Sequence, residues 1–234
     1  MSKIIRLIDW IASRERKVLA SWIMVVAGTC AFAGVTQLVA SGWTQSFDES
    51  FIRALRQSDD HDRPLGPAWL AQFAREITAL GSYSTLLLVV MISTLFLAVA
   101  REKVGLRTLL GATLSGYTVM LLLKRIIQRP RPDIVKHLAD FHSTSFPSGH
   151  SMMSAVVYVT LAFQLLRVVK DSRLRATTLS AAVVLTSLVG TSRVFLGVHF
   201  PTDVLAGWTA GLVWSLLWLL VVHSWEKRHE TARK

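Results

Sequence analysis

The stretch VLAGWTAGLVWSLLWLLVVHSW, residues 204–225, is free of Asp, Glu, Lys and Arg over 22 consecutive positions. A helix of this length, rising about 1.5 Å per residue, is as long as the roughly 30 Å hydrocarbon core of a bilayer is thick. Five more uncharged stretches occur along the chain, at residues 18–47, 77–100, 108–123, 141–166 and 176–192. The sequence therefore predicts an all-α integral membrane bundle of six transmembrane helices.

Charged residues set the boundaries of these spans. We expect the spans at about residues 18–41, 80–100, 106–124, 149–168, 175–192 and 203–223. The third and fifth uncharged stretches are shorter than a bilayer requires, so their helices should carry Lys124 and Arg193 at their ends. The first stretch is too long for the hydrophobic region of a signal peptide, and no repeat or linker divides the chain. We expect one membrane-embedded domain over residues 1–234.

The composition argues against a nucleic-acid partner and for membrane lipids as the surroundings. The chain is 52% hydrophobic and 18% charged, and its formal net charge is +11. The basic residues lie in short clusters between uncharged runs, whereas nucleic-acid binding favours one basic face. Cys30 is the only cysteine in the sequence, so no disulfide forms within the chain.

The distribution of basic residues predicts the orientation. Six spans put both termini on one side, and 16 of the 26 Lys and Arg residues fall on that side. Because cytoplasmic loops are enriched in basic residues, we expect cytoplasmic termini. The loop at residues 41–81 then faces outward, and its apolar residues from Trp69 to Leu80 recur at helical spacing. We expect an amphipathic helix there, lying in the membrane interface or packed as a cap on the spans.

Three polar blocks lie where the spans should be apolar. They are KRIIQRPRP at residues 124–132, PSGH at residues 147–150 and SRVFLGVHFPTD at residues 192–203. Odd spans end, and even spans begin, on the side opposite the termini. All three blocks should therefore meet at one face of the membrane.

The residue types in these blocks suit a phosphate group. Lys124, Arg131 and Arg193 supply three positive charges, as a compact ammonium and two planar guanidinium groups. Ser148 and Gly149 lie at a predicted helix start, where unpaired backbone N–H groups and the helix dipole favour an anion. We expect these five residues to bind phosphate.

The blocks resemble the three-part motif of the type 2 phosphatidic acid phosphatase superfamily. That motif reads Lys, six residues, Arg-Pro; then Pro-Ser-Gly-His; then Ser-Arg, five residues, His, three residues, Asp, and every position is filled here. The resemblance implies that His199 is a nucleophile that becomes a phosphohistidine, with Asp203 accepting a hydrogen bond from its other ring nitrogen. It also implies that His150 protonates the leaving oxygen and then activates water. No metal or other cofactor is expected.

The resemblance implies hydrolysis of a lipid phosphate or diphosphate at the outer membrane face. Undecaprenyl diphosphate, phosphatidylglycerol phosphate and phosphatidic acid are the expected candidates, with the lipid entering sideways from the outer leaflet of a bacterial inner membrane. Two alternatives stay open at this point. One is a lipid phosphotransferase that uses the same phosphohistidine, and the other is a non-catalytic membrane protein that binds an anion or a lipid phosphate. The oligomeric state is also open.

Several polar residues are expected to lie outside the chemistry. Arg125 and Arg129 fall off the motif positions, so we expect them to contact head groups or solvent. His137 and His142 lie between the first two blocks and are expected to be solvated. The GxxxG pattern at residues 207–211 predicts close packing between helices of the same chain.

Overall fold

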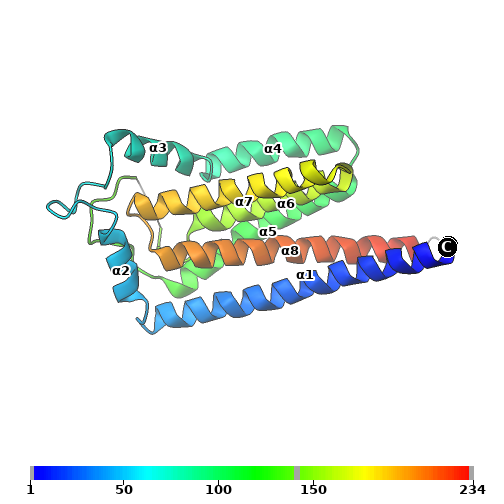
Figure 1. The fold of residues 1–234 in the computed structure, drawn as a ribbon, viewed down its shortest axis with the longest axis horizontal. Helices are drawn as coiled ribbons and strands as arrows, with labels where there is room; N and C mark the ends of the chain where they lie inside the picture. The colour runs from blue at the N-terminus through cyan, green and yellow to red at the C-terminus, as the bar shows by residue number, and fades with distance from the viewer. Residues whose placement is uncertain (1–2, 140–142, 232–234) are drawn as a thin grey trace.

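The computed structural model describes the backbone of residues 3–139 and 143–231, and the side chains of residues 18–139 and 143–226. Within these ranges the regular structure is helical (Figure 1). The helices are α1 (Lys3–Ala40), α2 (Gln45–Arg53), α3 (Ala68–Ala79), α4 (Tyr83–Val99), α5 (Lys103–Ile127), α6 (Gly149–Val168), α7 (Ser172–Phe195) and α8 (Pro201–Thr231). The predicted all-α membrane bundle is confirmed.

Five of the described helices are each long and apolar enough to cross a membrane, and the pair α3 and α4 supplies a sixth candidate. The axes of this pair differ by 43° across a short break. Ser82 begins α4, because its hydroxyl accepts a hydrogen bond from the Thr85 N–H at 3.3 Å. The sixth candidate is thus a bent pair of helices, counted together as one span, rather than one straight helix.

The two short uncharged stretches become longer helices than their uncharged residues suggest. Helix α5 has 25 residues and α7 has 24, so each continues into its charged ends. Lys124 and Arg193 lie inside these ends and are only 6% and 4% exposed. The expectation that both helices carry a cation near their ends is confirmed.

Helix α6 lies at the centre of the bundle and packs against α5, α7 and α8. Helix α8 approaches it closely at Gly207 and Gly211. A Cβ atom at Gly207 would lie 2.7 Å from the Ser148 carbonyl oxygen, and one at Gly211 would lie 2.5 Å from the Met152 carbonyl oxygen. The GxxxG pattern therefore serves packing within the chain.

Helix α2 lies across the end of the bundle at which α5 and α7 end and α6 and α8 begin, which we call the site end, and α3 lies beside α7 at that end (Figure 1). Helix α3 packs against α7 through Ala71, Ala74 and Thr78, while Trp69 and Phe73 stay exposed. The predicted amphipathic helix thus packs against α7 through one face and leaves aromatic side chains exposed on the other.

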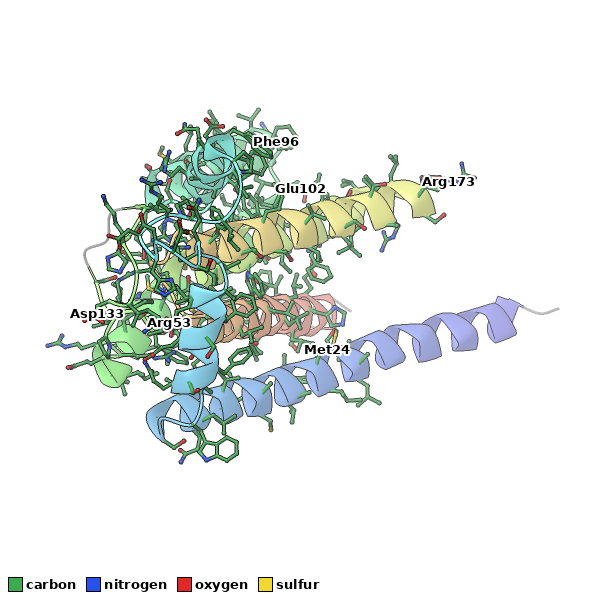
Figure 2. All side chains as sticks on the ribbon, turned by 60° about the vertical axis from the view of Figure 1, so that its left-hand side comes forward. Met24, Arg53, Phe96, Glu102, Asp133 and Arg173 are labelled. Carbon is green, nitrogen blue, oxygen red and sulfur yellow. The ribbon has the colours of Figure 1, made fainter. Side chains whose placement is uncertain are left out.

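The two ends of the bundle carry different parts of the chain. Figure 2 places Arg53 and Asp133 at the site end and Arg173 at the opposite end. Helix α1 begins and helix α8 ends at that opposite end (Figure 1). The three polar blocks and the loop with α2 and α3 therefore share one end of the molecule.

Candidate active site

Each polar block is placed by a helix end. Lys124 lies in the last turn of α5, Ser148 directly precedes α6, and Arg193 lies in the last turn of α7. His199 lies in the turn between α7 and α8, and Asp203 lies in the first turn of α8. The structure thus brings the three blocks to the site end, as the alternation of the spans predicts.

Local sequence explains why the helices end and begin here. Helix α5 stops at Gln128, which adopts a left-handed conformation (φ 47°, ψ 31°), and Pro130 follows. Gly197 has φ +74°, a left-handed conformation that favours glycine, and a Cβ atom there would lie 2.6 Å from Nη2 of Arg56. Pro201 then occupies the first position of α8, where its missing N–H costs nothing.

The start of α8 also orients Asp203. Its Oδ2 accepts a hydrogen bond from the Phe200 N–H at 3.0 Å, which is the reciprocal half of a capping box. The Ser145 hydroxyl donates to the same oxygen. Asp203 is fully buried, so both bonds hold the carboxylate in a fixed position.

His199 is 1% exposed and lies between Arg131 and Asp203. Its Nε2 is 3.2 Å from Nη1 of Arg131. Its Nδ1 is 3.5 Å from Oδ2 of Asp203 and 3.3 Å from Oγ of Ser145. The expected neighbour Asp203 is therefore present, and Ser145 is a second, nearer neighbour of the same ring nitrogen.

Burial lowers the pKa of His199 well below its ordinary value of 6.5, because desolvation disfavours the imidazolium form. The positive charges of Arg131, Arg193 and Lys124 lower this pKa further, and His150 acts in the same direction. The imidazole is therefore neutral at pH 7.

The three cations are held by neighbouring carbonyl and hydroxyl groups. Arg131 donates from Nε to the Ser143 carbonyl at 2.7 Å and from Nη1 to the Val198 carbonyl at 2.6 Å. Burial lowers the pKa of Arg131 to about 10, which leaves it charged at neutral pH.

The other two cations have fewer partners. Lys124 donates from Nζ to the Thr144 carbonyl at 2.5 Å. Arg193 donates from Nη1 to the Thr78 hydroxyl at 3.2 Å, and its Nε has no hydrogen-bond partner within the part of the chain that the structure describes. Donor capacity is thus left over for an anion.

The start of α6 forms another wall of the pocket. The Ser148 side chain accepts a hydrogen bond from the Ser151 N–H and so caps the helix. A Cβ atom at Gly149 would lie 2.6 Å from the hydroxyl oxygen of Tyr83, so only glycine allows this approach. The ring of His150 follows, with its centroid 6.1 Å from that of Tyr83.

An apolar groove of about 480 Å³ runs between α4, α5 and α6. Tyr83, Tyr117 and Met153 are among its lining residues. Because Tyr83 also touches the start of α6 beside His150, the groove and the basic pocket meet at this tyrosine. The site thus joins a charged end to an apolar one.

Arg129 corrects one expectation. It is 8% exposed rather than solvated, because its guanidinium lies between two fully buried carboxylates. It donates to Oδ1 of Asp203 at 2.7 Å and to Oδ2 of Asp48 at 2.8 Å. It also donates to the Thr202 hydroxyl at 2.8 Å and lies over the ring of Phe200, 4.2 Å from its centroid. Motif positions alone do not reveal this role, because Asp48 comes from α2.

The remaining polar residues divide as follows. Arg125 is exposed, as expected. His137 is half-buried and its ring contacts the Pro132 carbonyl, so it is not simply solvated. His142 lies outside the described residues. Among the described residues, no group of three or more His, Cys, Asp or Glu side chains is placed to hold a metal ion.

A pocket of positive charge around a neutral imidazole, opening on an apolar groove inside a membrane bundle, defines a class of membrane enzymes that act on lipid phosphates. The family model of the PAP2 superfamily matches residues 105–227, and the chain belongs to this family. The matched region contains all three polar blocks and omits α2 and α3.

Relatives agree on the chemistry. Phosphatidylglycerophosphatase B of Bacillus subtilis is 41% identical over 157 residues, which are 65% of this chain and 74% of the relative. Decaprenylphosphoryl-5-phosphoribose phosphatase of Mycobacterium tuberculosis is 32% identical over 99 residues, which are 41% of this chain and 49% of the relative. The protein is a PAP2-type lipid phosphate phosphatase and an integral membrane protein with several spans.

Solved structures agree on the fold. A crystal structure of a transmembrane PAP2 type phosphatidylglycerolphosphate phosphatase from Bacillus subtilis superposes with a TM-score of 0.76 at 31% identity, covering 87% of this chain and 96% of that chain. LpxE of Aquifex aeolicus, at 23% identity and a TM-score of 0.57, shares the fold.

Proposed function

We propose that this phosphatase hydrolyses a phosphate monoester on the head group of a diacyl lipid, with phosphatidylglycerol phosphate as the first substrate to test. Phosphatidylglycerophosphatase B, which aligns over 74% of its own length, supports this choice. Phosphatidic acid and undecaprenyl diphosphate are the comparison substrates, because the first carries a phosphate monoester on a smaller head and the second carries a terminal phosphate in a diphosphate on a polyprenyl tail. The reaction needs no metal ion and proceeds through a phosphohistidine on His199.

In the first step, Nε2 of His199 attacks phosphorus. The N–P bond forms and the P–O bond to the lipid breaks, while His150 gives a proton to the leaving oxygen. The position of Arg131 supports the role of His199 as the nucleophile, because Nη1 of Arg131 lies 3.2 Å from Nε2 of His199. A phosphate held by Arg131 is therefore held at the nucleophile.

In the second step, water attacks the phosphohistidine. A new O–P bond forms and the N–P bond breaks, and His150 takes the proton from the water. Lys124, Arg131 and Arg193 stabilise the phosphate oxygens in both steps, together with the backbone at Ser148 and Gly149. Asp203 holds the His199 ring in place through the contacts described above.

The apolar groove supports entry of the lipid from within the membrane. Its lining is mostly hydrocarbon, and Tyr83 joins it to the phosphate pocket. Acyl chains that lie in this groove keep their contact with the bilayer while the head reaches the cations. The site faces outward, which the excess of Lys and Arg at the opposite end supports (16 of 26 residues).

The observation that carries the proposal is the buried imidazole of His199, whose Nε2 lies 3.2 Å from Nη1 of Arg131. The test is release of free phosphate from phosphatidylglycerol phosphate in mixed detergent micelles. We expect His199→Ala to lose at least about 10³-fold in kcat, since removal of a nucleophile abolishes the covalent route. The exposed neighbour Arg125, changed to Ala, should stay within about twofold of the parent. Parent-like phosphate release by His199→Ala protein would refute the mechanism.

A further inference from the structure

Ser145 occupies an unexpected place between the histidine and the aspartate. It is fully buried, and its hydroxyl contacts Oδ2 of Asp203 and Nδ1 of His199, the latter at 3.3 Å. The direct separation of Nδ1 from Oδ2 of Asp203 is longer, at 3.5 Å. The hydroxyl is therefore the nearer acceptor for this ring nitrogen.

The directions of these hydrogen bonds follow from the chemistry of the groups. Asp203 is ionised, because the Arg129 guanidinium donates to its Oδ1 at 2.7 Å. An ionised carboxylate only accepts, so Ser145 uses its single proton toward Asp203. The Ser145 oxygen is left as an acceptor, and Nδ1 of His199 must carry the hydrogen.

The other side of the ring gives the same answer independently. Arg131 has donors and no acceptor, and its Nη1 lies 3.2 Å from Nε2 of His199. Nε2 must therefore carry a lone pair. The contacts on both sides of the imidazole select one tautomer, with Nε2 unprotonated and directed toward Arg131.

Ser145 is held in place from several directions. Its backbone N–H donates to the Arg129 carbonyl at 2.9 Å. The two residues before it are tied to the first polar block, because Lys124 donates to the Thr144 carbonyl and Arg131 donates to the Ser143 carbonyl. The hydroxyl thus sits on a segment whose position depends on the same cations that surround the phosphate pocket.

We propose that Ser145 is a positioning residue, whose hydroxyl links the Asp203 carboxylate to Nδ1 of His199. The link keeps Nε2 unprotonated for attack and stabilises the positive charge that the ring gains when Nε2 carries the phosphoryl group. Asp203 acts on the ring through Ser145 as well as through its own 3.5 Å contact with Nδ1. This inference rests on the proposed role of His199 as nucleophile.

The test compares Ser145→Thr with Ser145→Val, which have nearly the same shape and differ in the hydroxyl. Both add a methyl group to a buried site, so any overpacking is shared. We expect the Thr variant to keep kcat within about fivefold of the value of the unmutated protein. The Val variant should lose about 10- to 100-fold in kcat, the size expected for one hydrogen bond to a charged group. KM should stay within about threefold in both, because the Ser145 hydroxyl contacts Asp203 and His199 and is not one of the groups proposed to bind phosphate.

Ser145→Ala gives the same comparison without an added methyl group, and it should behave as the Val variant does. The affinity for inorganic phosphate, measured as inhibition, should not change in any of the three variants. Equal kcat values for Thr and Val, parent-like kcat for Ala, or a loss of phosphate affinity as large as the loss of kcat would overturn the proposal. An active His199→Ala protein would instead overturn the phosphohistidine mechanism itself, so the two failures are distinguishable.

Discussion

Among the basic residues of the first polar block, Arg129 is the one whose replacement should lower the stability of the folded protein most. Its guanidinium pairs with Asp48 at 2.8 Å and with Asp203 at 2.7 Å, and both carboxylates are fully buried. Arg129→Ala leaves two buried acidic groups without their shared cation. Removing one partner of a buried ion pair costs about 3–5 kcal/mol, because the remaining charge is uncompensated.

The assay is thermal unfolding of the detergent-solubilised protein, followed by tryptophan fluorescence. For a chain of this size, 3–5 kcal/mol corresponds to a decrease in Tm of roughly 6–20 °C. Arg125→Ala is the matched control, because Arg125 has the same side chain in the same block but is exposed. Its Tm should change by less than about 2 °C.

A double variant sharpens the test. Asp48→Asn removes one of the two charges that Arg129→Ala leaves unpaired, so the double variant should recover part of the lost Tm. If Arg129→Ala melts within about 2 °C of Arg125→Ala, the ion pairs do not contribute to the folded state as argued. If the double variant melts at the sum of the two single decreases, Asp48 and Arg129 are not coupled.

Two further predictions concern topology and pH. With Cys30 changed to Ser, Asp59→Cys in the α2–α3 loop should react with a membrane-impermeant maleimide in intact cells, whereas Lys170→Cys at the other end should react only after permeabilisation; the reverse pattern would invert the orientation. Because the pKa of His199 lies well below 6.5 when folded, the unfolded chain takes up a proton near pH 6.5 that the folded chain does not. The contribution of His199 to stability is therefore complete above pH 6.5 and is lost as the pH falls below this value. Tm should fall more steeply from pH 7 to pH 5 in the parent protein than in His199→Gln. Equal slopes in the two proteins would contradict the argument.

The convergence of the polar blocks was predictable from the sequence because it depends only on counting spans. Lys124, Arg193 and Asp203 lie beside helix ends, and the alternation of the spans places those ends together. Helix α1 begins at Lys3 and helix α8 ends at Thr231, so both continue well beyond the uncharged stretches at residues 18–47 and 204–225. The main departure is at the second span, where a short break at residues 80–82 separates α3 from α4.

The contacts of Arg129 with Asp48 and of Ser145 with His199 and Asp203 were not predictable from the sequence, because they depend on how the loops pack against the helix ends. Asp48 reaches Arg129 only when α2 lies against the start of α8, and no periodicity in the sequence encodes that docking. Ser145 likewise has no feature that separates it from the other serine residues near the spans. Tertiary packing decides both roles.

The ion pair between Asp48 and Arg129 has a consequence for engineering. The region that defines the family begins at residue 105, whereas Asp48 precedes it by more than two helices. A chimera joined at that boundary would graft the catalytic half of one enzyme onto the loop of another. Unless the first loop of the chimera also has a carboxylate at the position of Asp48, Arg129 loses one of its two buried carboxylate partners. An exchange of halves that aims to change substrate preference should therefore transfer Asp48 together with the region that begins at residue 105.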